Sequence, residues 1–263
     1  MMLDWDGWTW TAQQGLRPIE TTAEPQLLTA GPAAAAPARD TDSPLELYRI
    51  PEGGRHANMY LLRQGHYGII IDPSCQLPLD LQLQTSPMQP LLLLATHGHY
   101  DHIAQADRWR TDTGAPLLCH PQTQAYLADP ALNLSPQFDR PRRYQAPERL
   151  LEDGDLLPWT EDFSIRVLHL PGHTGGDCVY LVVQSAALDQ PQLAFTGDFL
   201  FENSVGRTDF PGGDYWEQQH SLETFAGLLQ TWPDTMLFLP GHGPVFGLPA
   251  ALHNPWLKPP EQS

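Results

Sequence analysis

The feature that most constrains this fold is a recurring pattern in which a short apolar run ends at a turn and a histidine or an aspartate follows. Such runs predict β-strands, and the glycines beside them allow sharp turns. The pattern follows the runs 91–95, 164–170, 193–196 and 236–239, and it leads to His97, His173, Asp198 and His242. Because these residues are far apart in the sequence, we expect one domain whose strand ends bring them to a shared sheet edge.

The first of these turns is the richest in metal-ligand types. Residues 96–102 read Thr-His-Gly-His-Tyr-Asp-His, directly after an apolar run. His97 and His99, two positions apart at a strand end, can face one cation together, whereas Asp101 and His102 lie on the turn into the next helix and can reach a second. A solvated histidine-rich loop is the alternative interpretation of this segment alone. The recurrence of the pattern favours a two-metal hydrolytic centre.

Four motifs together resemble the metallo-β-lactamase superfamily: T-H-G-H-Y-D-H at 96–102, G-H-T at 172–174, T-G-D at 196–198 and P-G-H-G at 240–243. The resemblance extends over about residues 45–257. The β-lactamases that bind two zinc ions with a cysteine carry that cysteine where this chain has Asp198, so the chain is closer to the glyoxalase II branch. G-R-T-D-F-P-G-G-D at 206–214 and H-N-P-W-L at 253–257 are similar to compact, single-domain glyoxalase II-like hydrolases of bacteria.

The resemblance implies an αββα sandwich, with two mixed β-sheets face to face, helices outside and the metal site at one edge. It also implies two divalent metal ions, Zn²⁺ or alternatively Fe²⁺ or Mn²⁺. The ligands of the first ion would be His97, His99 and His173; those of the second would be Asp101, His102 and His242; Asp198 would bridge the two.

Two close cations lower the pKa of a bridging water to near neutral, and Asp101 would hold the resulting hydroxide. Asp101 and Asp198 are therefore the two predicted catalytic residues. A thiol leaving group has a pKa of about 8.5 and departs as a thiolate without a dedicated general acid. Thioester hydrolysis therefore matches this chemistry, and the resemblance implies S-lactoylglutathione as substrate.

The substrate-binding residues are less evident. Two-domain glyoxalase II enzymes hold glutathione with a C-terminal helical domain, but only 21 residues follow His242. Arg207 is the candidate for binding a substrate carboxylate, and an ion pair with Asp209 or Asp214 is its alternative role. Tyr100 either lines the pocket or packs inside the fold.

Three rival functions remain open. A persulfide dioxygenase would hold one iron on His97, His173 and Asp198, although P-G-H-G at 240–243 matches the hydrolases better. A lactone or ester hydrolase would use the same hydroxide. A non-catalytic metal-binding module is the third possibility, which the complete ligand set disfavours.

Composition restricts the partners to small molecules. The net charge is −17, with a single lysine, so no basic stripe is available for nucleic acid. No apolar run reaches the length of a membrane span. The cysteines Cys75, Cys119 and Cys178 are scattered, and the first ten residues lack the basic start of a secretory signal, which predicts a cytoplasmic protein.

The chain divides into two predicted parts. Residues 1–44 predict a flexible N-terminal extension with an Ala/Pro-rich linker, and residues 45–263 form the hydrolase domain. Within the domain, helices are expected at 103–110, 121–128 and 217–229. The glycine-rich loop at 53–57, which contains His56, is expected to border the site.

Overall fold

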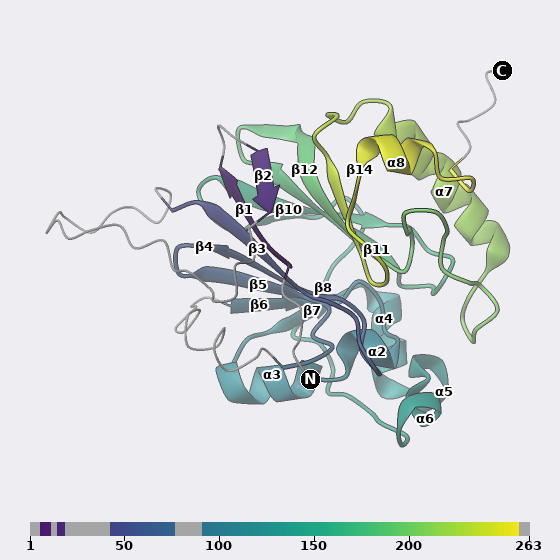
Figure 1. Cartoon of the computed structure of the whole chain (residues 1–263). Helices are drawn as coiled ribbons and strands as arrows, with labels where there is room; N and C mark the ends of the chain where they lie inside the picture. The colour runs from purple at the N-terminus through teal and green to yellow at the C-terminus, as the bar shows by residue number, and fades with distance from the viewer. Residues whose placement is uncertain (1–5, 12–14, 19–42, 77–90, 258–263) are drawn as a thin grey trace, which may run out of the picture.

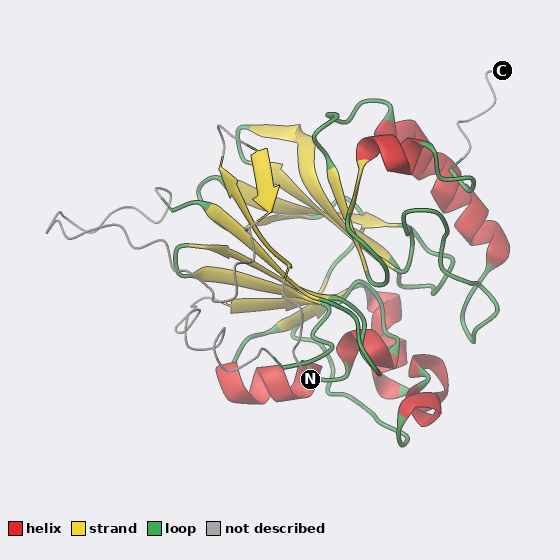
Figure 2. Ribbon diagram, in the orientation of Figure 1, coloured by secondary structure: helices red, strands yellow, loops and turns green. Residues whose placement is uncertain are grey.

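Two β-sheets pack face to face, and helices cover the outer face of each (Figures 1 and 2). The computed structural model describes residues 6–11, 15–18, 43–76 and 91–257, the first two segments as backbone strands. The predicted four-layer αββα sandwich is therefore confirmed.

The first sheet is mixed: its β5–β6–β7–β8 part is parallel and the rest is antiparallel. Its strand order is β2-β1-β3-β4-β5-β6-β7-β8. The strands are β1 (Asp6–Thr11), β2 (Gly15–Pro18), β3 (Leu45–Ile50), β4 (Met59–Gln64), β5 (Tyr67–Ile71), β6 (Leu91–Leu94), β7 (Leu117–Cys119) and β8 (Arg149–Leu150).

The second sheet is antiparallel except for the parallel pair β12–β13. Its order is β14-β13-β12-β11-β10-β9. The strands are β9 (Leu156–Pro158), β10 (Phe163–His169), β11 (Cys178–Gln184), β12 (Ala187–Gly197), β13 (Leu237–Pro240) and β14 (Phe246–Gly247).

Helices lie outside both sheets and complete the layers. Those that follow strands of the first sheet are α2 (Tyr100–Ile103), α3 (Ala106–Thr113), α4 (Pro121–Ala128), α5 (Pro130–Asn133) and α6 (Ser135–Phe138); those of the second are α7 (Tyr215–Leu229) and α8 (Leu248–Leu252). The helix expected at 103–110 is divided, because α2 ends before Ala104 and α3 begins after Gln105. None of the helices in the described part of the chain is long and apolar enough to cross a membrane.

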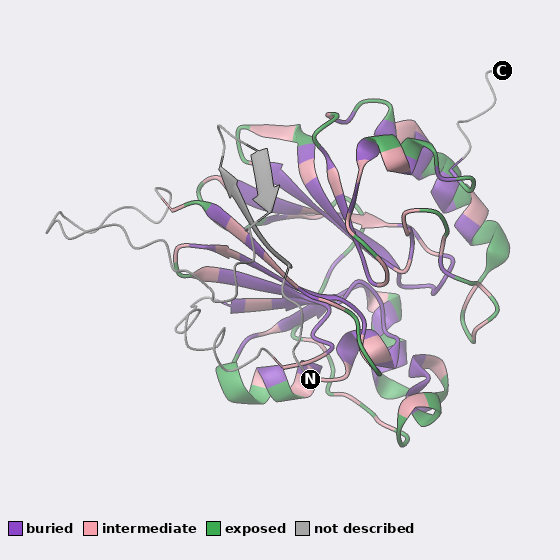
Figure 3. Cartoon of the chain, viewed as in Figure 1, coloured by how far each residue is buried: buried purple, intermediate pink, exposed green. Residues whose placement is uncertain are grey.

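Strand β11 shows why the sandwich has buried surfaces on both sides of a sheet. Tyr180 and Val182 pack between the two sheets, whereas Val179, Leu181 and Val183 belong to the apolar cluster that includes residues of α7. Because successive side chains of a strand point to opposite faces, both faces of this strand are covered. Figure 3 shows the buried strands between layers with exposed outer surfaces. The continuous apolar run of β11 follows from this double burial.

The strands β1 and β2 lie within the segment predicted as a flexible extension. β1 pairs antiparallel with β3 and with β2, so both continue the first sheet beyond β3. Most of the Ala/Pro-rich linker lies outside the described residues. The division of the chain at residue 44 stays a prediction.

Candidate metal centre

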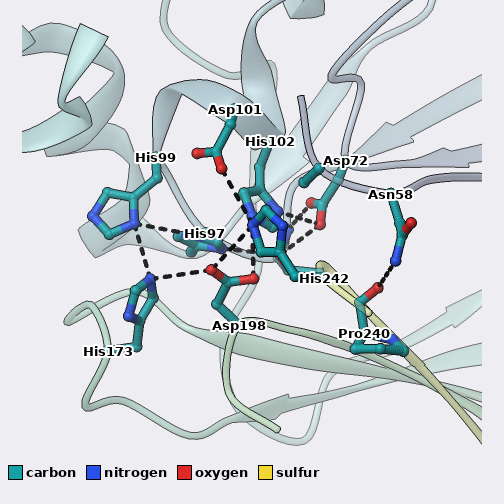
Figure 4. A network of polar contacts seen from close by, with 12 residues as sticks. Asn58, Asp72, His97, His99, Asp101, His102, His173, Asp198, Pro240 and His242 are labelled. Atoms are coloured by element: carbon teal, nitrogen blue, oxygen red, sulfur yellow. Dashed lines mark hydrogen bonds and ion pairs between the residues drawn. The ribbon is translucent and has the colours of Figure 1, made fainter. Parts of the chain in front are cut away.

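All seven predicted ligands lie together at one edge of the sandwich (Figure 4). The first sheet contributes those that follow β6, and the second contributes those that follow β10, β12 and β13. The two groups are His97, His99, Asp101 and His102 from the first sheet, and His173, Asp198 and His242 from the second. The structure therefore places them as the strand-end pattern predicts, and their role as ligands stays a prediction.

Two glycines allow the strand ends to approach each other. Gly197 has a left-handed φ of +50°, and a Cβ at this position would collide with Thr96. A Cβ on Gly241 would collide with the His102 ring and the Asp198 carboxylate. The Gly241 N–H donates to the Gly197 carbonyl at 2.7 Å. A larger residue at either position would push the ligand-bearing loops apart.

The first subsite comprises His97, His99 and His173. Their relative exposures are only 1, 3 and 2 %. His99 Nδ1 lies 3.1 Å from His97 Nε2 and 2.9 Å from His173 Nε2. Three imidazole nitrogens thus converge on one point inside the protein.

Hydrogen bonds behind these rings direct lone pairs toward that point. The Arg207 carbonyl lies 2.6 Å from His173 Nδ1, which must donate, so Nε2 is the bare nitrogen. Thr96 Oγ1 donates to Asp72 at 2.8 Å and is left to accept from His97 Nδ1 at 3.2 Å. His97 Nε2 and His173 Nε2 therefore carry no proton, and a proton on His99 Nδ1 can form a hydrogen bond with only one of them. A cation fits this donor set better than protons do.

The second subsite comprises Asp101, His102 and His242. Asp101 Oδ2 lies 3.3 Å from His242 Nε2. His102 Nδ1 contacts Asp72 Oδ2 at 2.8 Å, and His242 Nδ1 contacts Glu52 Oε2 at 2.6 Å. A carboxylate accepts from each Nδ1–H, so each Nε2 faces inward, where either a proton or a cation can bind it.

Asp198 lies between the two subsites, as Figure 4 shows. Its Oδ1 is 3.2 Å from His102 Nε2, and its Oδ2 is 3.6 Å from both His173 Nε2 and His242 Nε2. Within the described residues, His102 Nε2 and Asp198 Oδ1 are buried without a well-aligned hydrogen bond. Buried polar atoms of this kind require an explanation, and a cation bound beside them would supply one.

The electrostatic environment differs between the subsites. Burial, with the neighbouring His173, lowers the pKa of His99 to about 3, and burial with His102 lowers the pKa of His97 well below its usual value. Burial also opposes charge on His102, but the Asp198 and Asp72 carboxylates outweigh it and raise the pKa well above its ordinary value. His97 and His99 are thus neutral imidazoles, which is the metal-binding form.

At the second subsite, negative charge is in excess. Burial lowers the pKa of His242, but Asp101, Asp198 and Glu52 together raise it to about 9. Burial raises the pKa of Asp198, but His102, His242 and His173 hold it well below its usual range. A region that favours a protonated imidazole this strongly equally favours a bound cation in place of the proton.

The two candidate substrate residues are placed differently from the ligands. Tyr100 is buried, its ring packs on Phe138, and the Arg142 guanidinium lies 5.6 Å above it. Arg207 is exposed and forms a two-pronged ion pair with Asp209 at 2.5 Å. The alternative roles that the sequence left open, packing and an ion pair, are therefore both present.

Sequence reasoning missed the residues behind the ligands. Asp72 directly follows β5, has a left-handed φ of 54° and accepts hydrogen bonds from Thr96 and His102. It follows an apolar strand just as the ligands do, and this signal could have identified it. Glu52 gives no comparable signal. The loop at 53–57 borders the site, since the Ala57 N–H donates to the Asp101 carbonyl at 3.0 Å, whereas His56 Nδ1 lies 3.0 Å from the carbonyl of its neighbour Ala57.

A two-sheet sandwich has histidines and aspartates converging at one edge, and this cluster is suited to binding a metal. The family model of the metallo-beta-lactamase superfamily matches residues 53–242, and this chain belongs to that superfamily. The resemblance seen in the sequence is thereby confirmed.

Several curated proteins of bacteria are similar to the chain. An uncharacterized protein of Mycobacterium tuberculosis is 34 % identical over 204 residues, covering 74 % of this chain and 89 % of its own length. The probable metallo-hydrolase YqgX of Bacillus subtilis is 32 % identical with the same coverages. The hydroxyacylglutathione hydrolase GloC of Haemophilus influenzae is 30 % identical, covering 66 % of this chain and 79 % of its own.

Solved structures share the fold over most of the chain. The B3 metallo-beta-lactamase BLEG-1 has a TM-score of 0.68 at 32 % identity and covers 81 % of this chain and 99 % of its own. TTHA1623, in a di-iron-bound form, has a TM-score of 0.64 at 31 % identity and coverages of 80 % and 99 %. ETHE1 from Myxococcus xanthus has a TM-score of 0.57 at 25 % identity, with coverages of 80 % and 83 %.

Proposed function

We propose that this protein is a hydrolase that uses two metal ions and cleaves thioesters such as S-lactoylglutathione. The observation that carries the proposal is the position of Asp198, whose two oxygens face histidines of both subsites. A buried histidine cluster that served only packing would not need a carboxylate at its centre. The similarity to GloC, a hydroxyacylglutathione hydrolase, supports the substrate class.

The metal ions follow from the ligand types. Imidazole nitrogens with one or two carboxylates suit Zn²⁺, which we expect, and they also accept Fe²⁺ or Mn²⁺. The di-iron-bound form of TTHA1623 makes iron worth testing. When bound, the ions supply a water nucleophile of near-neutral pKa and polarise a carbonyl group.

Asp101 and Asp198 prepare the reaction from the protein side. Burial raises the pKa of Asp101, but the hydrogen bond from His242 and the charge of His102 lower it below its ordinary value. A carboxylate kept deprotonated accepts a hydrogen bond from the nucleophilic water and orients a water lone pair toward the thioester carbon. The water oxygen would bond to the thioester carbon while one water proton passes to the Asp101 carboxylate and the carbonyl electron pair moves onto the carbonyl oxygen. When that pair returns, the carbon–sulfur bond breaks and the sulfur keeps its electron pair as a thiolate. No proton donor is required because that thiolate is a stable leaving group.

Arg207 is the residue we propose for the substrate carboxylate. Its guanidinium lies 4.4 Å above the Phe210 ring, which itself lies 5.7 Å from the His99 ring and 6.4 Å from the His173 ring. Arg207 is thus one aromatic ring away from the first subsite. We expect Arg207→Ala to raise KM up to about fivefold with little change in kcat, in keeping with a solvent-exposed contact. An unchanged KM would leave Arg207 with only its ion pair to Asp209. Tyr100, being buried, is proposed to shape the pocket wall.

A substrate panel with metal analysis tests the function. The purified full chain, loaded with Zn²⁺ or Fe²⁺, would be assayed with S-lactoylglutathione, a lactone, an ester, a β-lactam and glutathione persulfide. We expect two ions per chain and hydrolysis of the thioester. One iron per chain with oxygen uptake on the persulfide would instead identify a dioxygenase. Two ions without turnover of any substrate would indicate a metal-binding module.

A preference for another substrate would change only part of the proposal. Cleavage of the lactone, the ester or the β-lactam with the thioester untouched would replace the substrate class and keep the hydrolase. The β-lactam belongs in the panel because BLEG-1 is named as a metallo-beta-lactamase.

We propose the cytoplasm as the place of action and a small molecule as the only partner needed for activity. All three cysteines are free thiols, which is consistent with a reducing compartment. The net charge of −17 disfavours nucleic acid as a substrate.

A further inference from the structure

The connection between β3 and β4 reaches from the first sheet to the loop that carries His242. Asn58 is fully buried there, and its Nδ2 donates to the Pro240 carbonyl at 2.8 Å. The Asn58 N–H donates to the Gly241 carbonyl at 2.7 Å, and Arg49 Nη2 donates to the Gly243 carbonyl at 3.0 Å. The backbone of the His242 loop is therefore held by a part of the chain that is far away in sequence (Figure 4).

Glu52 belongs to this connection and uses both of its oxygens on the same loop. Oε2 accepts from His242 Nδ1 at 2.6 Å, and Oε1 accepts from the Gly243 N–H at 2.8 Å. Glu52 is itself held in place, because its N–H donates to Asn58 Oδ1 at 2.7 Å. The carboxylate is thus fixed in a geometry that directs His242 Nε2 toward Asp101 and Asp198.

The two subsites differ in what lies behind their histidines. In the first subsite, His97 contacts a hydroxyl and His173 contacts a backbone carbonyl, both uncharged. In the second subsite, His102 contacts Asp72 and His242 contacts Glu52, both carboxylates. An anionic acceptor orients the ring and makes the opposite nitrogen a stronger donor to a metal ion.

Of the two carboxylates, Glu52 can be changed with less effect on the fold. The Asp72 side chain is buried and also holds Thr96, whereas the side chains of Glu52 and His242 are 41 % and 33 % exposed. A variant at Glu52 therefore tests metal binding rather than core packing.

We propose that Glu52 is a positioning residue that sets the affinity of the second subsite for its metal ion and thereby decides whether the chain carries one ion or two. This inference rests on the proposed two-metal site. The number of bound ions distinguishes the proposed hydrolase, which needs two, from the persulfide dioxygenase alternative, which needs one. Glu52, which is proposed to touch neither ion nor substrate, would therefore determine which reaction is possible.

The test is a metal titration of the full-length protein after its metal has been removed. Zn²⁺ would be added in competition with a chromophoric chelator to wild type, Glu52→Gln and Glu52→Ala. Gln retains one acceptor and loses the charge, whereas Ala loses both contacts. We expect the Kd of the second ion to rise about 10-fold in the Gln variant and up to about 100-fold in the Ala variant, the range for partners behind metal ligands. The Kd of the first ion should change less than about twofold.

The matched control is Glu223→Gln on α7, which removes the same charge from an exposed position. It should leave both Kd values as in wild type, and circular dichroism of the metal-free variants should match wild type. Equal changes at both subsites, or no change at either, would overturn the role of Glu52 while the two-metal site stands. A wild-type protein that binds a single ion would overturn the two-metal site itself, and the inference with it.

Discussion

The two halves of the metal centre are built by different means. The first subsite is closed off from solvent, burial lowers the pKa of both His97 and His99, and uncharged groups lie behind His97 and His173. The second is partly exposed at His242, and carboxylates stand beside and behind its histidines. Burial thus selects the neutral ligand form in one half, whereas accumulated negative charge attracts the cation in the other. We expect the first ion to be retained and the second to exchange with solution.

The largest effect is expected from the residue that the two halves share. Asp198→Asn removes one charge that faces both subsites. We expect kcat/KM for the thioester to fall more than about 100-fold, beyond the range for residues behind the ligands, with loss of metal at both subsites. Inductively coupled plasma mass spectrometry and steady-state kinetics would measure this. A variant that keeps two ions and full turnover would show that Asp198 does not bridge.

Single ligand removals separate the halves. The His173→Ala variant should lose the first ion and keep only the second, which binds weakly. The His242→Ala variant should lose the second ion and keep about one ion per chain, at the buried first subsite. Metal content after gel filtration distinguishes these results. Equal metal loss in both variants would contradict the independence of the subsites.

The buried carboxylate partner should affect stability as well as metal binding. Asp72→Asn replaces one buried carboxylate oxygen by an NH2 group, so either the Thr96 N–H at Oδ1 or the pair formed by His102 Nδ1 and Thr96 Oγ1 at Oδ2 loses its acceptor. We expect the free energy of unfolding of the metal-free protein to fall by about 1–3 kcal/mol. Glu52→Gln, at the exposed partner, should change it by less than about 0.5 kcal/mol. Urea denaturation followed by fluorescence measures the free energy of unfolding of both variants. Equal changes in the two variants would contradict the predicted difference between the buried and the exposed carboxylate.

The smallest effect is a difference in titration between two histidines of the metal-free protein. The pKa of His99 is lowered to about 3, so the stability it contributes as a neutral group is lost as the pH falls from 6.5 toward 3. The pKa of His242 is raised to about 9, so its contribution is present below pH 6.5 and is lost as the pH rises through 9. Imidazole nitrogen NMR across this range would follow both. Similar midpoints for the two rings would remove the electrostatic contrast between the halves.

The sequence predicted that the seven side chains would gather because each lies close after a strand end, a local pattern that survives in the fold. Their role as ligands stays a prediction. Residues 121–128 were likewise predicted with the bounds of α4. The partners behind the ligands could not be found in this way. Glu52 and His242 are separated by 190 positions, and only the docking of the two sheets brings them together. The addition of β1 to the edge of β3 also depends on a strand pairing that the Trp-rich segment alone does not specify.

Each subsite takes its donors from both sheets: two residues come from the segment after β6, which includes α2, and one comes from a loop of the opposite sheet. A cation bound in either place is therefore a cross-link between the layers, and part of its binding energy opposes their separation. Removing the metal should therefore lower the melting temperature of the whole protein. A substitution that weakens the packing between the two sheets should likewise lower the amount of zinc or iron that stays bound after buffer exchange.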